Sequence, residues 1–179
     1  MDSWSWLYRW YKIYLRLGLR IIRMLRFLKL TVIAPLLFAC LSTTVFSAYE
    51  VVDVVDGDTL WFLHAGKREK LRLSQIDAPE MNQPFGLEAT KLLETLILNE
   101  EITIVFQSKK DRYGRYLGEV FLHDENINKL LVRNGLAWVY DRYVTDDSYY
   151  EDLEIAKNQR INIWSDSKQI SPWEWRKIH

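Results

Sequence analysis

The stretch 50–76 reads EVVDVVDGDTLWFLHAGKREKLRLSQI and holds three β-rich runs, at 50–55, 59–64 and 70–76. Short turn sequences, each with a glycine, separate the runs. Connections of this length are too short for a crossover between parallel strands. The stretch therefore predicts an antiparallel three-stranded meander.

After this meander the spacing of the apolar residues changes to that of a helix. Over 86–98 they recur at steps of three and four, which predicts one apolar helical face. Two further strands are predicted at 101–107 and 115–123, and two further helices at 126–134 and about 146–158. Five strands with a helix after the third fit a small Greek-key β-barrel of the OB-fold type with three helices, in the α+β class and mainly β.

The composition predicts one globular domain with extensions. The chain has 179 residues, of which 49% are hydrophobic and 27% are charged, and its formal net charge is zero. Residues 1–48 hold seven Lys and Arg against one acidic residue, a charge of +6; residues 49–179 hold 17 basic against 23 acidic residues, a charge of −6. Any anion site in residues 49–179 must therefore be local, because bulk positive charge is lacking there. The sole cysteine, Cys40, excludes a disulfide framework and a cysteine-based zinc site.

The segment 1–48 has the features of membrane targeting. Residues 30–49 carry no charge and follow basic residues, and short side chains precede Ala48 as they do at a signal cleavage site. We expect cleavage near Ser47 or Ala48 and export, to the periplasm or as a secreted protein. An uncleaved membrane anchor is the alternative, and Met24 is an alternative start. The predicted boundaries are 1–48 for the signal or anchor segment, 49–166 for the barrel domain and 167–179 for a tryptophan-rich tail.

Five charged residues stand at the ends of strands that can be neighbours in such a barrel. They are the carboxylates Asp58, Asp77 and Glu80 and the guanidiniums Arg72 and Arg115. Carboxylate oxygens bind Ca²⁺ or Mg²⁺, arginines offset charge that develops on a phosphorane, and a remaining carboxylate can take a proton from water. The combination suits cleavage of a phosphodiester bond. For Arg72, purely structural ion pairs with these carboxylates explain the charge equally well.

Other polar residues have simpler explanations. Asp56-Gly57 is the usual signature of a tight hairpin turn. The three histidines, His64, His123 and His179, are scattered singly, so we expect each at the surface or in a turn. A zinc hydrolase would lack its ligands in this sequence.

Five segments together resemble the staphylococcal nuclease, or thermonuclease, family. They are VDGDTL (55–60), RLSQIDAPE (72–80), DRYGR (111–115), LVRNGLA (131–137) and NIW (162–164), in the family's order and at similar separations. The resemblance implies an OB-fold barrel with three helices. It also implies a Ca²⁺-dependent nuclease that acts on DNA and RNA, favouring single-stranded or frayed substrates, and that leaves 3′-phosphates and 5′-hydroxyls.

The resemblance assigns the metal site and the general base by position. Asp58 and Asp77 match the family's metal carboxylates, and Ala78 lies where a backbone carbonyl completes the metal's ligands. Glu80 matches the carboxylate that is usually assigned as general base to the attacking water.

The resemblance also assigns the residues that contact the substrate. Arg72 and Arg115 match the pair that holds the scissile phosphate. Tyr113 and Tyr143 match tyrosines beside the nucleotide. For Tyr143, packing in the core or at its rim is an equal alternative.

The sequence departs from the family's pattern in the loop 81–85, which is shorter and less basic, and in its acidic domain. In the tail 171–176, SPWEWR, docking of the two indoles on the barrel is favoured over stacking on bases. The main alternative to an enzyme is an inactive module that binds nucleic acid or a peptide. A third reading makes the basic stripe at 9–23 the functional part and the barrel a passive scaffold at a membrane. We expect a monomer with possible membrane association through 1–48.

Overall fold

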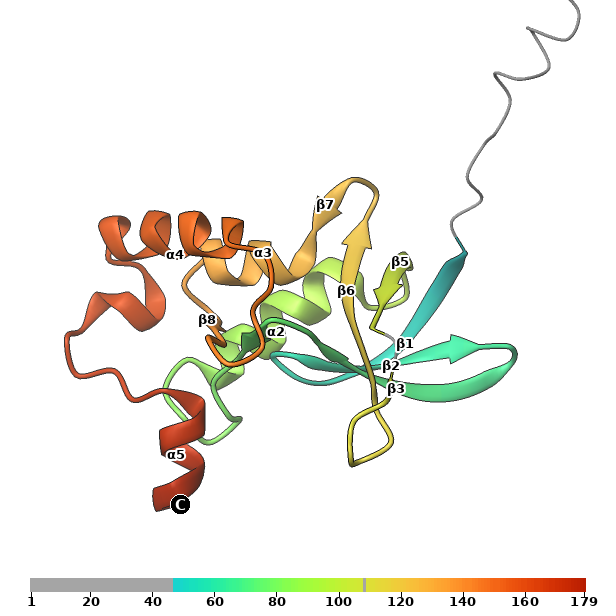
Figure 1. The fold of residues 1–179 in the computed structure, drawn as a ribbon, viewed down its shortest axis with the longest axis horizontal. Coiled ribbons are helices and arrows are strands. Elements are labelled where there is room, and N and C mark those ends of the chain that lie inside the picture. Colours follow the sequence, from blue (N-terminus) through green and yellow to red (C-terminus); the bar gives the residue numbers. More distant parts are fainter. Residues whose placement is uncertain (1–46, 108) are drawn as a thin grey trace, which may run out of the picture. The chain divides into compact units, whose positions relative to one another are not determined.

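In the computed structural model, which describes residues 47–107 and 109–179, the predicted meander is present (Figure 1). Strand β1 (Ala48–Asp56) pairs antiparallel with β2 (Thr59–His64), and β2 pairs antiparallel with β3 (Lys67–Leu73). Thr59 lies opposite Arg72 in this register. The turn after β1 is therefore next to the end of β3, as the sequence predicts.

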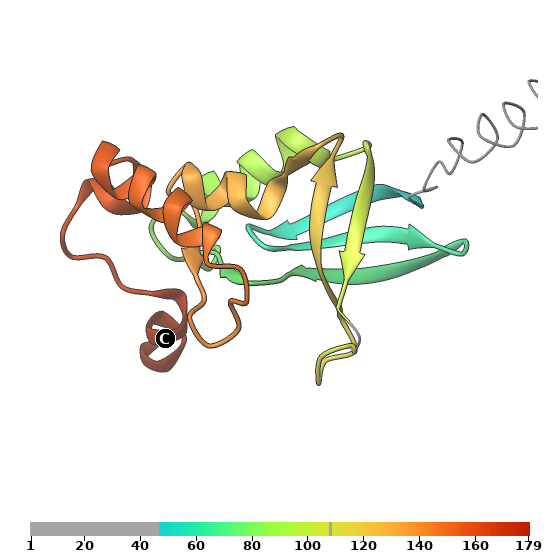
Figure 2. The same cartoon turned by 45° about the horizontal axis from the view of Figure 1, so that its top comes forward.

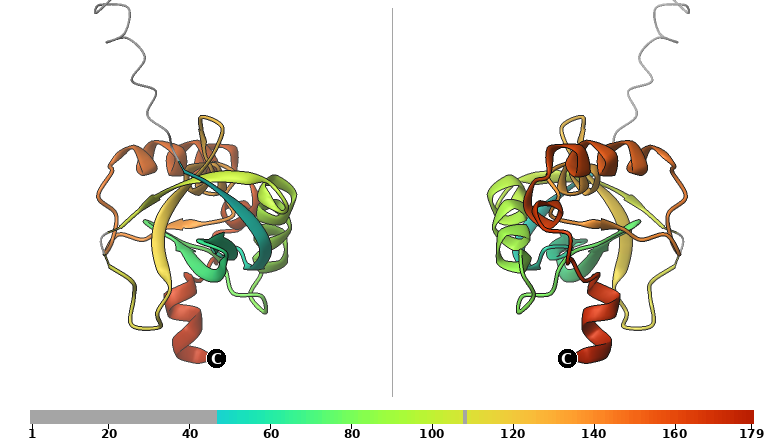
Figure 3. Two further views of the ribbon diagram at one scale, coloured as in Figure 1. Left: turned by 90° about the vertical axis from the view of Figure 1, so that its right-hand side faces the viewer. Right: turned by 90° about the vertical axis from the view of Figure 1, so that its left-hand side faces the viewer.

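Two more strands close the sheet into a five-stranded barrel (Figures 2 and 3). Strand β5 (Glu101–Phe106) pairs antiparallel with β1, and β6 (Tyr116–Leu122) pairs antiparallel with β5. Because β6 also pairs parallel with β3, the two ends of the sheet meet. The predicted barrel is confirmed, and a short strand β7 (Glu125–Asn126) extends it beside β6.

The third strand begins and ends three residues earlier than predicted, which corrects the expected run 70–76. It ends at Leu73 because Gln75 has a left-handed backbone with φ of 67°, which interrupts an extended chain. The next two residues form a separate strand, β4 (Ile76–Asp77), which pairs antiparallel with β8 (Trp138–Val139). Asp77 is thus positioned by a different strand pair from Arg72.

The three predicted helices are confirmed with small shifts at their ends. They are α2 (Gly86–Ile97), α3 (Ile127–Arg133) and α4 (Ser148–Gln159), and a 3₁₀ turn, η1 (Asn162–Ser165), follows α4. Helix α2 packs against β1, and α3 packs against β6 and α4. The predicted signal or anchor segment lies outside the described residues.

A fourth helix, α5 (Pro172–Ile178), differs from the prediction of three helices. Proline in the first turn suits a helix start because its missing N–H is not needed there. The apolar residues of α5, which are Trp173, Trp175 and Ile178, do not recur at steps of three and four, so the sequence shows no apolar helical face there. Figure 1 shows it at the C-terminus, beside the loop that leads into α2.

Apolar side chains from the barrel interior and the inner faces of α2, α3 and α4 form one core, which includes Leu60, Phe62, Leu71, Leu93 and Leu131. In the part of the chain that the structure describes, no helix is both apolar enough and long enough to span a bilayer.

His64 departs from the expectation of a surface or turn histidine. Its ring stacks on Tyr116, with centroids 5.6 Å apart, and lies 6.0 Å from both Phe62 and Phe106. The reason is the alternation of β2, which puts His64 on the same face as buried Phe62. The expectation holds for the turn residue His123 and the exposed terminal residue His179.

Candidate active site

Arg72 joins the two predicted metal carboxylates. Its Nη2 lies 2.6 Å from Oδ1 of Asp77 and 3.1 Å from Oδ2 of Asp58. Both carboxylates are buried, Asp77 completely. The other guanidinium nitrogen, Nη1, donates to the carbonyls of Leu73 and Ile76, so the bend between β3 and β4 fixes the arginine. The structure therefore brings these three predicted residues into one cluster.

The turn before β2 is held against this cluster by main-chain contacts. The Leu73 N–H donates to the carbonyl of Asp58, and the Ala78 N–H donates to Oδ2 of Asp58 at 3.0 Å. Oδ1 of Asp58 accepts from the Thr59 hydroxyl. A Cβ on Gly57 would lie 2.7 Å from Cβ of Ala89 and 2.8 Å from Cβ of Ala78. This glycine thus allows a close approach between the turn and its neighbours.

Gln75 fixes the bend on its other side. Its side-chain Oε1 accepts from the N–H and hydroxyl of Thr145 and from the N–H of Asp146, and its Nε2 donates to Glu119. The carbonyl of Gln75 accepts from the N–H of Tyr140. A residue in a strained backbone conformation is thus held by partners from β6 and from the loop before α4.

Burial and mutual repulsion set the electrostatics of the carboxylates. Burial raises the pKa of Asp77, although the guanidiniums of Arg176 and Arg72 act to lower it. Burial, followed by repulsion from Asp58, raises the pKa of Asp56 to about 6. Oδ1 of Asp56 accepts from the Asp58 N–H at 3.1 Å. The sequence interpretation of Asp56 as a turn residue therefore missed its place beside the site, and only its position two residues from Asp58 pointed to it.

This donor set fits a hard divalent cation such as Ca²⁺. Carboxylate and carbonyl oxygens are the ligands that Ca²⁺ takes, and crowded buried carboxylates gain from added positive charge. Among residues 47–107 and 109–179, no group of three or more His, Cys, Asp and Glu side chains converges as a ready metal site. The candidate ligands are thus two carboxylates, Asp58 and Asp77, with the Ala78 carbonyl and water.

Glu80 lies beside the cluster, on a loop that is closed by hydrogen bonds between its own residues. The carbonyl of Glu80 accepts from the N–H of Gln83, and the N–H of Glu80 donates to the side chain of Gln83. Oε1 of Glu80 lies 2.6 Å from Nη1 of Arg176, which also contacts Asp77. Glu80 is thus joined to the cluster through an arginine that the sequence analysis did not assign to the site.

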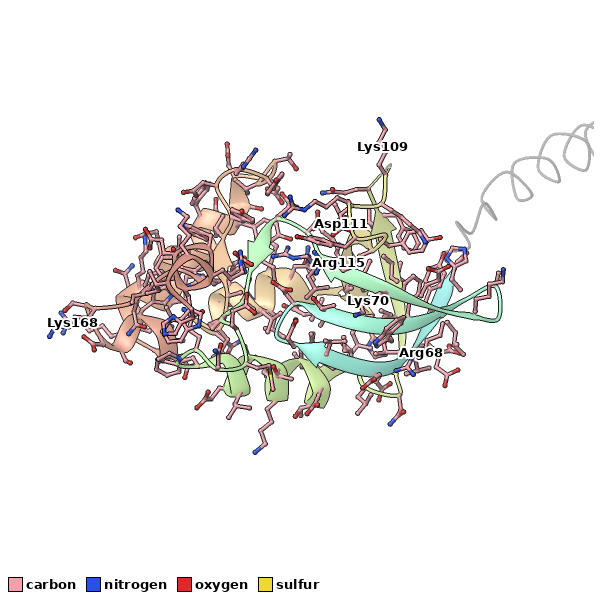
Figure 4. The ribbon with its side chains drawn as sticks, turned by 90° about the horizontal axis from the view of Figure 1, so that it is seen from below. Arg68, Lys70, Lys109, Asp111, Arg115 and Lys168 are labelled. Atoms are coloured by element: carbon pink, nitrogen blue, oxygen red, sulfur yellow. The ribbon has the colours of Figure 1, made fainter. Side chains whose placement is uncertain are left out.

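Arg115 is the predicted site residue that the structure leaves apart. Its Nε and Nη2 each lie 2.8 Å from Oδ2 of Asp111, and Figure 4 shows the two side by side. Over the described ranges, no hydrogen bond or ion pair connects its guanidinium to Asp58, Asp77 or Glu80. Arg115 directly precedes β6, the strand that pairs with β3 beside Arg72. Arg115 could therefore approach Arg72 only across the pairing of β6 with β3.

The two predicted nucleotide tyrosines are exposed, Tyr113 by 67% and Tyr143 by 54%. The guanidinium carbon of Arg115 lies 5.4 Å from the centre of the Tyr113 ring. Tyr143 meets Tyr140 edge to face, with ring centres 4.9 Å apart. Packing of Tyr143 in the core is thus wrong, whereas its contact with Tyr140 fits packing at the rim, and both rings are exposed.

A family model described as staphylococcal nuclease homologue matches residues 70–166 of this chain. The chain belongs to the staphylococcal nuclease family. Membership in this family confirms the resemblance drawn from the five sequence segments, four of which overlap the matched region.

The chain is similar over most of its length to several known proteins. A protein of Escherichia coli named "Uncharacterized endonuclease" is 39% identical over 127 residues, which are 70% of this chain and 82% of that protein. The "Micrococcal nuclease" of Shigella flexneri is 38% identical over 139 residues, 72% of this chain and 79% of that protein. The "Staphylococcal-like nuclease CAN1" of Arabidopsis thaliana is 29% identical over 135 residues, 75% of this chain and 40% of that protein.

The match to the staphylococcal nuclease family model stops at residue 166, before α5. The tail nevertheless docks on the domain as the sequence analysis expected. Trp173 stacks on Tyr140 with ring centres 5.2 Å apart, and Nε1 of Trp175 donates to Asn82. The sequence motif SPWEWR was the signal for this docking, but nothing in it indicated that Arg176 would reach Asp77.

Proposed function

We propose that this member of the staphylococcal nuclease family is an exported, Ca²⁺-dependent nuclease that hydrolyses DNA and RNA and leaves 3′-phosphates. The observation that carries the proposal is the buried cluster of Asp58, Arg72 and Asp77, in which one guanidinium lies within 3.1 Å of both carboxylates. A buried cluster of this kind offers oxygens to a cation and a guanidinium fork to a phosphate.

The site residues have different roles in the proposed hydrolysis. Asp58, Asp77 and the carbonyl of Ala78 would hold Ca²⁺, which when bound polarises a phosphoryl oxygen. Arg72 binds the scissile phosphate from its place at the bend. Arg115 approaches the same phosphate from the start of β6 and stabilises the leaving oxygen.

Glu80 acts as the general base in this proposal. It takes a proton from a water whose oxygen attacks the phosphorus in line with the 5′-oxygen. The new P–O bond forms as the P–O5′ bond breaks, and the 5′-oxygen, stabilised by Arg115, takes a proton from a solvent water and leaves as a hydroxyl. The phosphate then stays on the 3′ end of the other product. Tyr113 and Tyr143 offer exposed rings beside which the bases of a single-stranded or frayed substrate can stack.

The direct test is cleavage of a labelled single-stranded oligodeoxynucleotide by the purified full-length protein. We expect degradation with Ca²⁺, products that carry 3′-phosphates, and no degradation with EGTA. Glu80→Gln should lower turnover by at least about 10²-fold with folding intact, because the base is lost. Glu88→Gln, a matched change at an exposed glutamate of α2, should not lower it.

Binding of the oligonucleotide without any cleavage would refute the enzyme and support the inactive module. N-terminal sequencing of the protein tests the proposed export and removal of the signal segment. Cleavage near Ser47 would support export with removal of 1–48, whereas an intact N-terminus in the membrane fraction would identify an anchor.

A further inference from the structure

Arg176 makes closer contacts with the candidate active site than one of the predicted arginines does. Its Nη2 lies 2.7 Å from Oδ2 of Asp77, and its Nη1 lies 2.6 Å from Oε1 of Glu80 and 3.3 Å from Oδ1 of Asp77. One guanidinium thus connects a predicted metal ligand to the predicted general base. By contrast, the guanidinium of Arg115 is paired with Asp111.

The helix that carries Arg176 is docked by contacts of its own. The Trp173 ring lies parallel to Tyr140, at an interplanar angle of 2°. The side-chain amide of Gln83 donates to the carbonyl of Ile170 at 2.6 Å, just before the helix. Figure 1 shows α5 next to the loop that contains Gln83. The guanidinium is therefore delivered to the site by packed structure rather than by a loose tail.

Arg176 and a divalent cation need the same carboxylate. In the structure Oδ1 of Asp77 faces Arg72, and Oδ2 of Asp77 faces Arg176. Burial acts to lower the pKa of the Arg176 guanidinium, but its hydrogen bonds to Asp77 and Glu80 outweigh burial and raise it. A cation bound to Asp77 would meet a positive charge held within hydrogen-bond distance of the same atoms, and like charges this close oppose each other. The carboxylate of Asp77 is buried, whereas the side chain of Arg176 is 42% exposed, so solvent screens part of this repulsion.

We propose that Arg176 is a positioning residue of the active site, which holds Asp77 and Glu80 in place before the cation binds and loses its contact with Asp77 when the cation binds. The proposal rests on the proposed function in one respect, that Asp77 is a cation ligand. Two consequences follow. Arg176 weakens cation binding, and by reciprocity the bound cation weakens the docking of α5.

The test is direct binding of Ca²⁺ to the full-length protein by titration calorimetry, without nucleic acid. We expect Arg176→Gln and Arg176→Ala to bind Ca²⁺ more tightly than wild type by about 5- to 50-fold, which lies within the range of about 5- to 150-fold for typical coupling between sites. Lys177→Ala removes the same charge from the next residue of the helix, and we expect it to change the affinity for Ca²⁺ less than about 2-fold, because among the described residues Lys177 forms no ion pair with Asp77 or Glu80 and its exposed charge is screened. Arg176→Lys keeps the positive charge, so the affinity of this variant for Ca²⁺ should stay near that of wild type.

The outcomes separate this inference from the proposed function. Equal or weaker Ca²⁺ binding by both neutral variants would overturn the inference, because a purely structural role for Arg176 predicts weaker binding. A gain for Arg176→Lys as large as for Arg176→Gln would also overturn it, since the charge would then be irrelevant. No Ca²⁺ binding by wild type and by all variants would instead refute Asp77 as a cation ligand.

Discussion

Arg72 balances the charge of two buried carboxylates, so Arg72→Gln should destabilise the folded protein even without substrate or cation. Removing one partner of a buried ion pair costs about 3–5 kcal/mol, because the remaining charge stays buried. Two features of this site reduce that cost. Asp77 keeps its contacts with Arg176, and Asp58 keeps the N–H of Ala78. We therefore expect a loss of about 2–3 kcal/mol in the free energy of unfolding.

The assay is urea unfolding of the full-length protein in EGTA at neutral pH, followed by far-ultraviolet circular dichroism. The dependence of the unfolding free energy on urea should be unchanged, so that the midpoint reports stability. Arg68→Gln is the matched control, because its ion pair with Asp53 is about half exposed and should be worth no more than about 1 kcal/mol. Equal losses for the two variants would refute the account of Arg72 as the partner of buried charge.

Two predictions concern the segments that position the cluster, and both are measured by the same urea unfolding. Gly57→Ala should cost about 1–3 kcal/mol, because the added Cβ would lie 2.7 Å from Ala89; a variant as stable as wild type would show that the turn can move away freely. Gln75→Ala should lower the free energy of unfolding by about 1–3 kcal/mol, because Thr145 loses its hydrogen-bond acceptor. It should also lower nuclease activity, because the bend before β4 loosens. Full activity in this variant would show that the bend does not position the site.

The barrel was predictable because its signals are local. Alternating strands, turn glycines and a change to helical spacing are each visible within a dozen residues, and they identified all five barrel strands and α2, α3 and α4. The same alternation puts His64 on the strand face of buried Phe62, so the local pattern also indicated that this histidine is not a surface residue.

The remainder depends on contacts between segments that are distant in the sequence. The left-handed backbone of Gln75 is held by Thr145 and Asp146, residues that no local pattern connects to it. Arg176 meets Asp77 through the docking of α5, whose apolar residues do not follow helical spacing and so do not indicate its orientation. Residue type and spacing thus predicted which groups have suitable chemistry, whereas the second arginine at the carboxylates, Arg176, could be found only in the folded chain.

In the proposed function, carboxylates from separate segments act together on one cation and one phosphate. The most direct measurement compares the rate of hydrolysis of single-stranded DNA by wild-type protein and by Asp58→Asn, each with Ca²⁺ and with EGTA. The account predicts that wild type is active only with Ca²⁺ and that Asp58→Asn loses at least about 10²-fold of that activity. Equal rates for the two proteins with Ca²⁺, or full activity of wild type in EGTA, would contradict it.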